Sequence, residues 1–460
     1  MPFLAPLVFL VAQAPSQAEI DKIITSMLEK TKTPSASVIV TQNGKTLYRK
    51  SFGFANLEWK AKATPTTKYR LASVTKQFTA MLIMRQVEKG NLNLFAPVKT
   101  ILPDWPKAWD GVTVQHLLTH TSGIPEYTEG IEFAFTMRKD QSWSSIVESV
   151  AKKPVKFAPG AEWSYCNTGY LTLGLILEKV SGKKYAELLQ SEIYDPLGMK
   201  QSTVMDDGRV TPEMASGYTV VNGVLKPSVY ISATQPGSAG YLISTVDDLA
   251  KWLQALDQGK LISKASYAEM WRPVRLTTGK NHPYGFGWGI ELARGHRILH
   301  HSGGIPGFST FVMELPDDHM QIAVLTNSND GEPEVTARQI VGKFIPELDS
   351  EKIASVPSTP AERERVQKLV RYLASGEWPE GFMTPKMSEE MTKIKAQVMA
   401  SVKSFGKPSN FELLERKGQP GGREAQDWRI TCEKVILILK VSVDPDGKVA
   451  GALVSSVVPK

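Results

Sequence analysis

The β-forming segments of this 460-residue chain are gathered in two places that lie far apart in the sequence. Near the start, two β-rich runs flank Asn43-Gly44, and this pair favours a type I′ turn because both of its central residues need positive φ. Four further runs with strand character follow one another late in the chain. The expected strands are 35–41, 45–49, 284–292, 297–301, 308–314 and 321–327. We expect both groups to form one antiparallel sheet with helices on its faces.

Helical patterns precede, separate and follow these strands. Apolar residues recur at helical spacing, and Gly or Pro residues mark several of the ends. The expected helices are 17–30, 73–88, 142–152, 171–180, 184–193, 244–256 and 334–344. Pro196 and Gly198 are expected to break the helix that begins at Lys184. The pattern therefore predicts an α+β fold, in which an antiparallel sheet flanked by helices is joined to a mainly helical subdomain.

A different composition follows this first part of the chain. Residues 346–360 hold Pro, Ser and charge, and predict a linker. Beyond it the expected elements are helices 361–375 and 388–402 and strands 410–415, 427–432, 435–443 and 448–457. We therefore expect a large domain over residues 19–345 and a small C-terminal α+β accessory domain over residues 361–460.

The first residues have the pattern of a secretory signal peptide. Residues 3–12 are apolar, and Ala12-Gln13-Ala14 supplies a small-x-small cleavage pattern. We expect residues 1–14 to be removed and the protein to be exported, to the periplasm or out of the cell. A short apolar first strand or helix is the alternative, because no Lys or Arg precedes the run. No other run approaches about 18 apolar residues, so no transmembrane anchor is expected.

Charge and cysteine content exclude two further classes of protein. The formal net charge is +7, from 54 Lys and Arg against 47 Asp and Glu, and no block of consecutive cations predicts a nucleic-acid partner. Cys166 and Cys432 fall in the two expected domains, so no disulfide framework is expected. The pattern carries no indication of oligomeric state.

Ser73-Val74-Thr75-Lys76 is the first candidate catalytic pattern. Residues i and i+3 share a face of a helix, so the Lys76 ammonium is expected beside the Ser73 hydroxyl. A serine is a weak nucleophile until a neighbour takes its proton, and a Lys can do so if burial lowers its pKa. The alternative is a Ser that caps the helix, followed by a solvated Lys.

Tyr165-Cys166-Asn167 is the second pattern. A phenol next to an ammonium has its pKa lowered and can shuttle protons, so Tyr165 is a candidate for proton transfer. Asn167 offers a donor and an acceptor for orienting a substrate. A Tyr in a loop and an Asn that caps the next helix are the alternative.

The third pattern, His301-Ser302-Gly303-Gly304, is expected at the end of one strand. Glycines there let a substrate backbone approach the strand edge closely. An ordinary Gly-rich turn is the alternative.

In this order, the S-x-x-K, Y-x-N and H-x-G patterns resemble the serine β-lactamase and penicillin-recognising family, especially its class C-related branch of esterases and D-amino-acid peptidases. Further stretches that resemble this family are 116–123, 195–199, 239–245 and 284–288. The resemblance covers residues 19–345 and implies a β-lactamase/transpeptidase-like fold. It also implies a serine hydrolase that acts on a small-molecule ester, amide or peptide substrate without a cofactor.

The resemblance implies a role for each matching residue. Ser73 would be acylated, Lys76 would accept or relay its proton, and Tyr165 would act as general base and then as acid. Asn167 would hold the substrate amide or ester.

The same resemblance assigns the third pattern, from His301 through Ser302 and Gly303 to Gly304, to substrate binding. His301 would stand where the family often has Lys. The backbone N–H groups of Ser73 and Gly304 would form the oxyanion hole.

Two residues depart from the family's usual pattern. Cys166 replaces the more usual Ser in the middle of the second pattern, and it is an alternative nucleophile. His301 replaces a fixed cation, and a neutral His binds a β-lactam carboxylate less well than Lys does. We therefore expect esterase or peptidase activity in preference to true β-lactamase activity.

Three other interpretations remain. His116 and His120 are at i and i+4, which suits a metal, but no third ligand is evident and no metal site is expected. A Ser-His-Asp hydrolase would need a G-x-S-x-G turn, and before Ser238 the place of the first Gly is taken by Pro236. A non-catalytic binding or sensing protein would keep the scaffold, although it has no need of the complete proton-transfer set.

Overall fold

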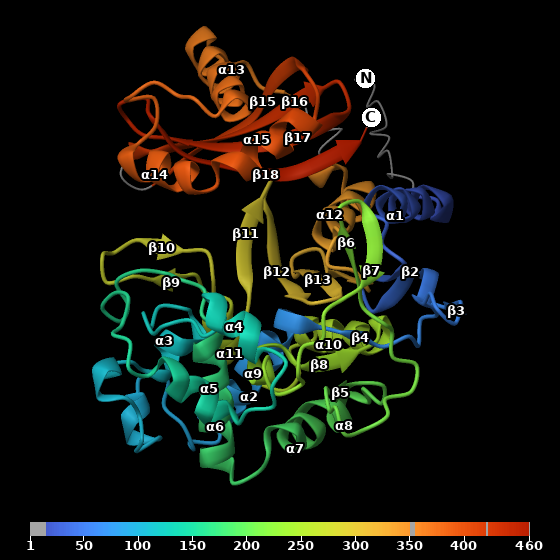
Figure 1. Ribbon diagram of the computed structural model, residues 1–460, viewed down its shortest axis with the longest axis vertical. Helices are drawn as coiled ribbons and strands as arrows, with labels where there is room; N and C mark the ends of the chain where they lie inside the picture. Colours follow the sequence, from blue (N-terminus) through green and yellow to red (C-terminus); the bar gives the residue numbers. More distant parts are fainter. Residues whose placement is uncertain (1–14, 350–354, 420–421, 460) are drawn as a thin grey trace, which may run out of the picture. The chain divides into compact units, whose positions relative to one another are not determined.

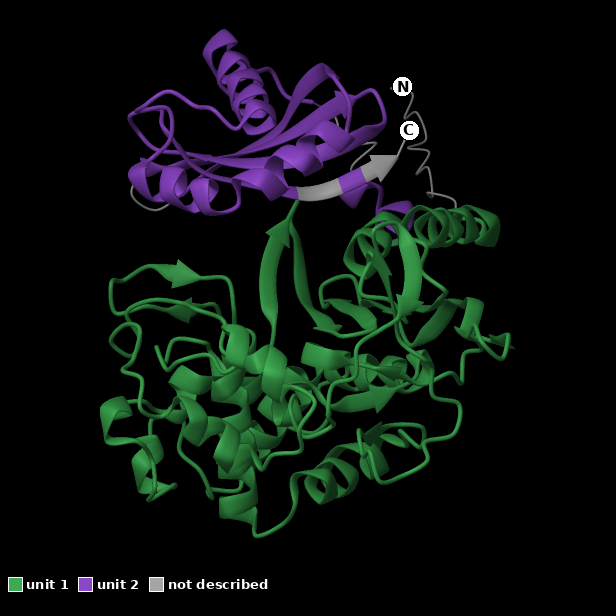
Figure 2. Cartoon of the chain, in the orientation of Figure 1, with its two compact units in different colours: residues 1–340 green, residues 341–460 purple. Residues whose placement is uncertain are grey.

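The computed structural model describes residues 15–349, 355–419 and 422–459 (Figure 1). The expected signal peptide, residues 1–14, lies outside the described residues. The chain divides into two compact units, residues 1–340 and 341–460 (Figure 2). This division falls inside helix α12 (Pro333–Phe344). The domain boundaries expected from the sequence stay predictions.

A seven-stranded antiparallel sheet is the main sheet of unit 1 (Figure 1). Its strand order is β11-β12-β13-β14-β1-β2-β3, and β1 pairs with β14 so that Ala36 lies opposite Thr326. The strands are β1 (Ser35–Gln42), β2 (Lys45–Asn56), β3 (Ala61–Lys62), β11 (Gly289–Ala293), β12 (His296–Ile305), β13 (Phe308–Leu315) and β14 (Met320–Thr326). This confirms the expected sheet, which joins strands from both parts of the sequence.

The centre of the sheet is apolar and covered. Asn43 and Gly44 both have positive φ, 50° and 75°, as the predicted turn requires. Strand β14 is buried along its whole length, and β1 along all but its last residue. Helix α10 (Val246–Asp257) contacts both of these strands, and helix α1 (Gln17–Thr31) contacts β1. Both faces of these strands are buried, so that the polar Ser35, Ser37 and Thr41 of β1 are buried as well.

A mainly helical region lies between strands β3 and β11 in the sequence. Helix α2 (Thr75–Glu88) is buried there against α6, α7 and α9, and its Phe78 ring stacks on Trp252 at 4.1 Å between centroids. The other helices are α3 (Val114–Leu118), α4 (Ile131–Thr136), α5 (Trp143–Val150), α6 (Asn167–Ser181), α7 (Tyr185–Leu189), α8 (Asp195–Leu197), α9 (Gly237–Gly240) and α11 (Lys264–Met270), with 3-10 turns η1 (Ala72–Val74), η2 (Val98–Thr100) and η3 (Lys107–Trp109). Short strands are β4 (Tyr69–Arg70), β5 (Thr203–Val204), β6 (Tyr218–Val221), β7 (Val224–Pro227), β8 (Leu242–Ser244), β9 (Val274–Arg275) and β10 (Asn281–His282). This confirms the helical subdomain.

Several expected boundaries in unit 1 are wrong. The strand expected over 45–49 runs on to Asn56, and the helix expected over 171–180 begins at Asn167. The helix expected over 184–193 continues through a π-helical turn (η4, Gln190–Tyr194) and Pro196 into α8; it ends at Gly198, one of the two expected breaks, where φ is 65°. Pro196 is tolerated because it enters in the first turn of α8. Strand β12 does not end at His301; it runs on through both glycines to Ile305. Residues 284–288, expected to be strand, lie before β11.

Unit 2 is a four-stranded antiparallel sheet with helices. The strand order is β15-β16-β17-β18, and Trp428 and Ile430 of β16 are fully buried in its core. The elements are α13 (Pro360–Ser375), α14 (Pro385–Lys393), α15 (Lys395–Ser404), β15 (Pro408–Gly418), β16 (Glu424–Cys432), β17 (Val435–Val443), β18 (Val449–Pro459) and the 3-10 turn η5 (Pro346–Leu348). One helix expected over 388–402 is instead two, divided at Ile394, because α14 buries Met387 and Met391 whereas α15 has no fully buried residue. The expected α+β fold of this part is confirmed.

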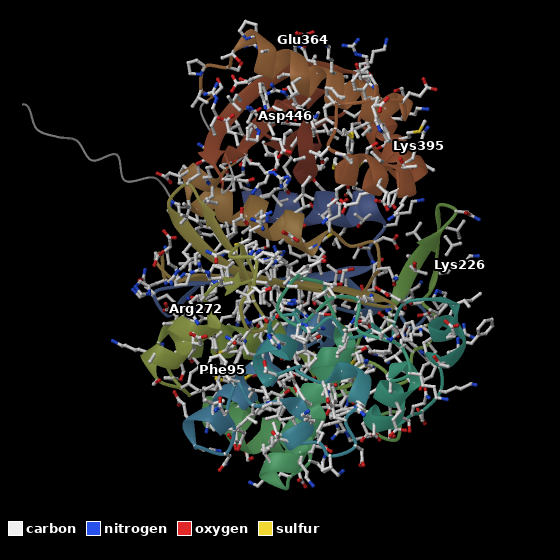
Figure 3. All side chains as sticks on the ribbon, turned by 90° about the vertical axis from the view of Figure 1, so that its left-hand side faces the viewer. Phe95, Lys226, Arg272, Glu364, Lys395 and Asp446 are labelled. Atoms are coloured by element: carbon white, nitrogen blue, oxygen red, sulfur yellow. The ribbon has the colours of Figure 1, made fainter. Side chains whose placement is uncertain are left out.

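Figure 3 labels exposed charged side chains on both units, cations on unit 1 and both signs on unit 2. Lys226 and Arg272 belong to unit 1, and Glu364, Lys395 and Asp446 to unit 2. None of the helices in the described part of the chain combines the length and the apolar character that a membrane span needs.

Candidate active site

Ser73 lies in the 3-10 turn η1, directly before helix α2. The residue before it, Ala72, has a φ of 49°, a left-handed backbone that costs a non-glycine residue about 1–3 kcal/mol. Leu71 is fixed on both sides: its N–H donates to Leu242 O at 2.8 Å, and its carbonyl accepts the Thr310 hydroxyl at 2.8 Å. The surrounding structure therefore holds Ser73 in one orientation.

Lys76 is fully buried one turn after Ser73. Its Nζ lies 3.0 Å from Ser73 Oγ, 2.8 Å from Asn167 Oδ1 and 2.8 Å from Ala239 O. Burial lowers the pKa of Lys76 to about 7, although the Glu126 carboxylate opposes this shift. The predicted neighbourhood of Ser73 and Lys76, and the predicted direction of the pKa shift, are both observed.

These contacts decide what the neutral amine can do. The oxygens of Asn167 and Ala239 are carbonyl oxygens, which only accept hydrogen bonds. A neutral amine therefore spends its two N–H groups on them, and its lone pair faces the Ser73 hydroxyl. This arrangement lets Ser73 donate its proton to Lys76 near neutral pH.

Tyr165 lies against Lys76, but its pKa moves in the direction opposite to our expectation. Lys76 Nζ is 4.8 Å from the centre of the Tyr165 ring. Burial raises the pKa of the Tyr165 phenol well above its usual value, and a hydrogen bond with Ser73 only partly offsets it. The expected lowering is thus wrong, because burial, with the nearby Glu126 charge, raises the pKa of the phenol by more than the hydrogen bond with Ser73 lowers it. A phenol that stays protonated suits a proton donor better than a base.

Asn167 is held by a residue that the sequence patterns did not identify, Glu126. The Asn167 N–H, the first of helix α6, donates to Glu126 Oε2. Glu126 Oε1 accepts from both the N–H and the hydroxyl of Thr128, at 2.9 and 2.8 Å. A carboxylate at a helix N-terminus is favourably placed by the helix dipole. Glu126 therefore fixes the residue whose side chain receives a hydrogen bond from Lys76.

Cys166 is buried beside these residues. Its Sγ donates to Ile124 O at 3.5 Å, and burial raises the pKa of the thiol to about 12. Reactive cysteines need a lowered pKa, so this environment disfavours the thiolate that an alternative nucleophile requires. Cys166 and Cys432 are both buried and lie in different units.

The third pattern lies in strand β12, which passes the turn that carries Ser73. Gly303 is buried against Leu71, and Ser302 is exposed. Gly304 has open space where a side chain would stand, and it lines the same cavity as Ser73. The two glycines therefore have different roles: Gly303 allows close packing against Leu71, and Gly304 leaves the cavity open.

His301 is turned into the protein. Its Nδ1 is 2.6 Å from Ser302 O, and its Nε2 is 2.9 Å from the Tyr284 hydroxyl. Burial, with the nearby Lys76 charge, lowers the pKa of His301 to about 3. A neutral, hydrogen-bonded imidazole replaces the fixed cation, as the sequence comparison of His with Lys anticipated.

A cavity of about 220 Å³ opens above Ser73. Its wall has no Asp, Glu, Lys, Arg or His side chain. The lining residues are Ala72, Ser73, Tyr127, Thr128, Phe133, Asn167, Ile231, Pro236, Ala239, Gly240, Gly304, Ile305 and Pro306. Of the residues expected to bind substrate, Asn167 and Gly304 thus reach the cavity, whereas His301, Ser302 and Gly303 are not among the residues that line it.

The two histidines considered for a metal have other partners. His116 Nδ1 accepts the Thr113 N–H at 3.2 Å, and His120 Nδ1 accepts the Cys166 N–H at 3.1 Å. Over the described residues, 15–349, 355–419 and 422–459, no three His, Cys, Asp or Glu side chains are grouped to hold a metal ion.

Comparisons with known proteins identify the family of the chain. A family model described as Beta-lactamase matches residues 20–343. Penicillin-binding protein 4* of Bacillus subtilis (strain 168) is 33% identical over 349 residues, which are 72% of this chain and 76% of that protein. The octameric penicillin-binding protein homologue from Pyrococcus abyssi superposes with a TM-score of 0.67 at 25% identity, over 93% of this chain and 96% of that one. A D-stereospecific amidohydrolase from Streptomyces sp. superposes with a TM-score of 0.62 at 26% identity, over 71% of this chain and 98% of that one.

Proposed function

The chain belongs to the beta-lactamase family, and from that premise we propose that it is a serine hydrolase that acts through an acyl-enzyme on Ser73. The observation that carries the proposal is the contact of Lys76 Nζ with Ser73 Oγ, at 3.0 Å. A buried amine with a pKa of about 7 is half deprotonated at neutral pH, so it is available as a base. A binding or sensing protein has no use for such a pair, and this is why the non-catalytic alternative ranks second.

The proposed reaction has two halves. In the first, the Ser73 hydroxyl proton passes to Lys76 while Oγ attacks the substrate carbonyl carbon. The C–O or C–N bond then breaks, and the departing alcohol or amine takes a proton through Tyr165, which Lys76 reprotonates. In the second half, water attacks the Ser73 ester, and the acid leaves while Oγ regains its proton.

Backbone donors are proposed to stabilise the oxyanion of both halves. Ser73 and Gly304 both line the cavity, and we propose their N–H groups as the donors, each typically worth about 3 kcal/mol in the transition state. Asn167 is proposed to orient the substrate amide or ester. Its Oδ1 accepts from Lys76, which leaves its amide donors for the substrate.

The cavity favours a small acyl group without charge. Its volume of about 220 Å³ is below the usual range of ligand pockets, about 300–1,000 Å³, and its wall carries no ionic side chain. A β-lactam presents a carboxylate, and neither this wall nor the neutral His301 supplies a cation for it. We therefore propose small esters and neutral amides or peptides as substrates, in preference to β-lactams. The name of one similar protein, a D-stereospecific amidohydrolase, supports amide-type substrates.

A fluorophosphonate probe followed by peptide mapping tests the nucleophile. We expect an adduct on Ser73 that disappears in Ser73→Ala and persists in Ser238→Ala. Ser238 is the matched control because it is fully buried nearby, its hydroxyl donates to Tyr170 O at 2.8 Å, and it was the nucleophile of the alternative Ser-His-Asp interpretation. An adduct on Ser238 or Cys166 would assign a different nucleophile. No adduct on folded protein would favour the non-catalytic alternative.

We also propose that the protein is exported through its first 14 residues. Mass spectrometry of the mature chain should find Pro15 at its N-terminus. A chain that keeps Met1 would contradict export by cleavage of this segment.

A further inference from the structure

Three buried side chains connect the second and the third catalytic patterns. His120 follows helix α3, Tyr284 precedes strand β11, and His301 lies within strand β12. His120 Nε2 is 3.2 Å from the Tyr284 hydroxyl oxygen, which is 2.9 Å from His301 Nε2. All three residues are at least nine-tenths buried. None of them lines the cavity above Ser73.

The backbone at each end of this row decides where every proton lies. The Cys166 N–H can only donate, so His120 Nδ1 accepts and the His120 ring proton is on Nε2. The Ser302 carbonyl can only accept, so the His301 ring proton is on Nδ1 and its Nε2 is free to accept. Of the two histidines, Tyr284 therefore accepts from His120 and donates to His301, and its hydroxyl also has a hydrogen-bond contact with Tyr170. The four bonds run in one direction, from the Cys166 N–H to the Ser302 carbonyl.

Both imidazoles must be neutral for this direction to hold. A charged His120 would present a proton on Nδ1 to the Cys166 N–H, and a charged His301 would present one on Nε2 to Tyr284. Burial and the Lys76 charge lower the pKa of His120 well below its usual value and that of His301 to about 3. The environment thus supports the neutral forms that the geometry requires.

One end of the row holds the segment that carries Tyr165. The Ser164 N–H donates to His120 O at 2.9 Å, and the Cys166 N–H donates to His120 Nδ1 at 3.1 Å. The imidazole also lies against the Tyr165 ring, with 4.3 Å between the ring centres. His120 therefore accepts hydrogen bonds from the residues on both sides of Tyr165, Ser164 and Cys166. Its own φ of 59° is a strained value for a non-glycine residue, which is typical of functional positions.

The other end holds the strand that borders the cavity. Ser302 directly precedes Gly303 and Gly304, and Gly304 lines the cavity with Ser73. A shift of Ser302 would move the Gly304 N–H relative to Ser73. The hydrogen-bonded row therefore connects Tyr165, the proposed proton donor, with the backbone of Gly304, the proposed oxyanion donor.

We propose that His120 and Tyr284 are positioning residues, which act with His301 to hold Tyr165 and the Gly304 backbone at a fixed separation through one chain of hydrogen bonds. This inference rests on the proposed hydrolase function. Neither His120 nor Tyr284 lines the substrate cavity, so the two residues act through Gly304, which lines it, and through Tyr165, which is hydrogen-bonded with Ser73.

Tyr284→Phe tests the chain by removing one hydroxyl from its middle. We expect kcat for a small ester to fall on the order of tenfold while KM stays within about twofold, because misplacement of catalytic groups affects the transition state more than binding. Tyr185→Phe is the matched control: Tyr185 is equally buried, its hydroxyl lies 2.6 Å from the Thr79 hydroxyl, and it is outside the site. Equal kcat values for the two variants would overturn the proposal.

Histidine NMR of the wild-type protein tests the chain of hydrogen bonds without a measurement of activity. With ¹⁵N-labelled histidine, and with His120→Gln and His301→Gln for assignment, we expect His120 protonated on Nε2 and His301 protonated on Nδ1. A charged ring or the reverse tautomer at either position would overturn the chain. This measurement also decides the case if Tyr284→Phe fails to fold.

The two experiments separate this proposal from the proposed function. A wild-type protein without Ser73 labelling or turnover would refute the hydrolase function, and with it the catalytic role of the hydrogen-bonded row. The histidine tautomers would still show whether the row of hydrogen bonds exists. An active wild type with the wrong tautomers would refute the chain alone.

Discussion

Gly303 lies so close to Leu71 that a Cβ on it would stand 2.1 Å from the Leu71 carbonyl oxygen. The strand of the third pattern thus packs directly on the chain that leads into Ser73. The neighbouring Gly304 is different, since a Cβ there would meet no atom within 4 Å. Two adjacent glycines therefore make opposite predictions.

Gly303→Ala should destabilise unit 1, whereas Gly304→Ala should not. Overpacking of a buried site typically costs about 1–3 kcal/mol, and the contact at Gly303 is with backbone, which cannot turn aside. At Gly304 we expect a change within about 0.5 kcal/mol of the free energy of unfolding, as for an exposed position. Urea unfolding of the two variants side by side measures the difference. Equal destabilisation by both would show that the strand does not pack on Leu71 in this way.

Lys76→Met should abolish acylation while the protein stays folded. The substitution removes the only nitrogen within reach of Ser73 Oγ in the described hydrogen bonds, and a general base contributes roughly 100- to 10,000-fold. Replacing a buried amine by an apolar side chain of similar length need not lower stability. Fluorophosphonate labelling and thermal unfolding measure the two effects.

Lys68→Met is the control for Lys76→Met. Lys68 is also buried in unit 1, but its Nζ donates to Pro212 O at 3.0 Å, away from Ser73. We expect its labelling rate to match that of the wild type. Equal loss in both variants would point to a general effect of removing a buried lysine.

The rate of Ser73 acylation should rise with pH through neutrality. The pKa of Lys76 is lowered to about 7, so below that value the amine is charged and cannot accept a proton. The rate should increase about tenfold per pH unit below the pKa and level off above it. Because burial raises the pKa of Tyr165, ionisation of the phenol should not reduce the rate until well above pH 10. The pH profile of kcat/KM checks both sides, and a rate that falls from pH 6 to pH 8 would contradict Lys76 as base.

Tyr165→Phe should reduce turnover much more than it reduces labelling. Because burial keeps the phenol protonated, we expect Tyr165 to give a proton to the leaving group, a step worth roughly 100-fold or more. The fluoride that leaves a fluorophosphonate needs no proton, so labelling of Ser73 should be slowed far less. Kinetics with an alkyl ester and with the probe compare the two. Equal losses would return Tyr165 to the role of base.

The parts of the fold that local sequence determines were predictable. Asn43-Gly44 forms its turn, because this signal involves only neighbouring residues. The end of β12 was missed because glycines usually stop a strand, whereas here Gly303 is required by the approach of Leu71 from a distant part of the chain.

In the candidate site, too, the residues linked by local sequence were predictable and those brought together by the fold were not. Ser73 and Lys76 could be paired from their spacing in one helix. His120 and Tyr284 stand 164 residues apart, and the sequence suggests no link between them; His120 is considered there only as a metal ligand. Glu126 had no signal beyond its charge. The pKa of Tyr165 was predicted with the wrong sign because sequence proximity identifies a neighbouring charge but not the depth of burial, which is the stronger influence here.

The pairing of β1 with β14 also limits how early during synthesis the main sheet can form. Ala36 needs Thr326 as its partner across the sheet, so a ribosome must make nearly the whole of unit 1 before the central pair can close. At about 5–20 residues per second, the ribosome would make strand β12 on the order of 10–60 seconds after it makes the turn that carries Ser73. A nascent chain that carries Ser73 and Lys76 is thus without its third pattern for most of its synthesis. Such non-local closure also predicts slow refolding, because loop-closure entropy is lost before the sheet contacts form.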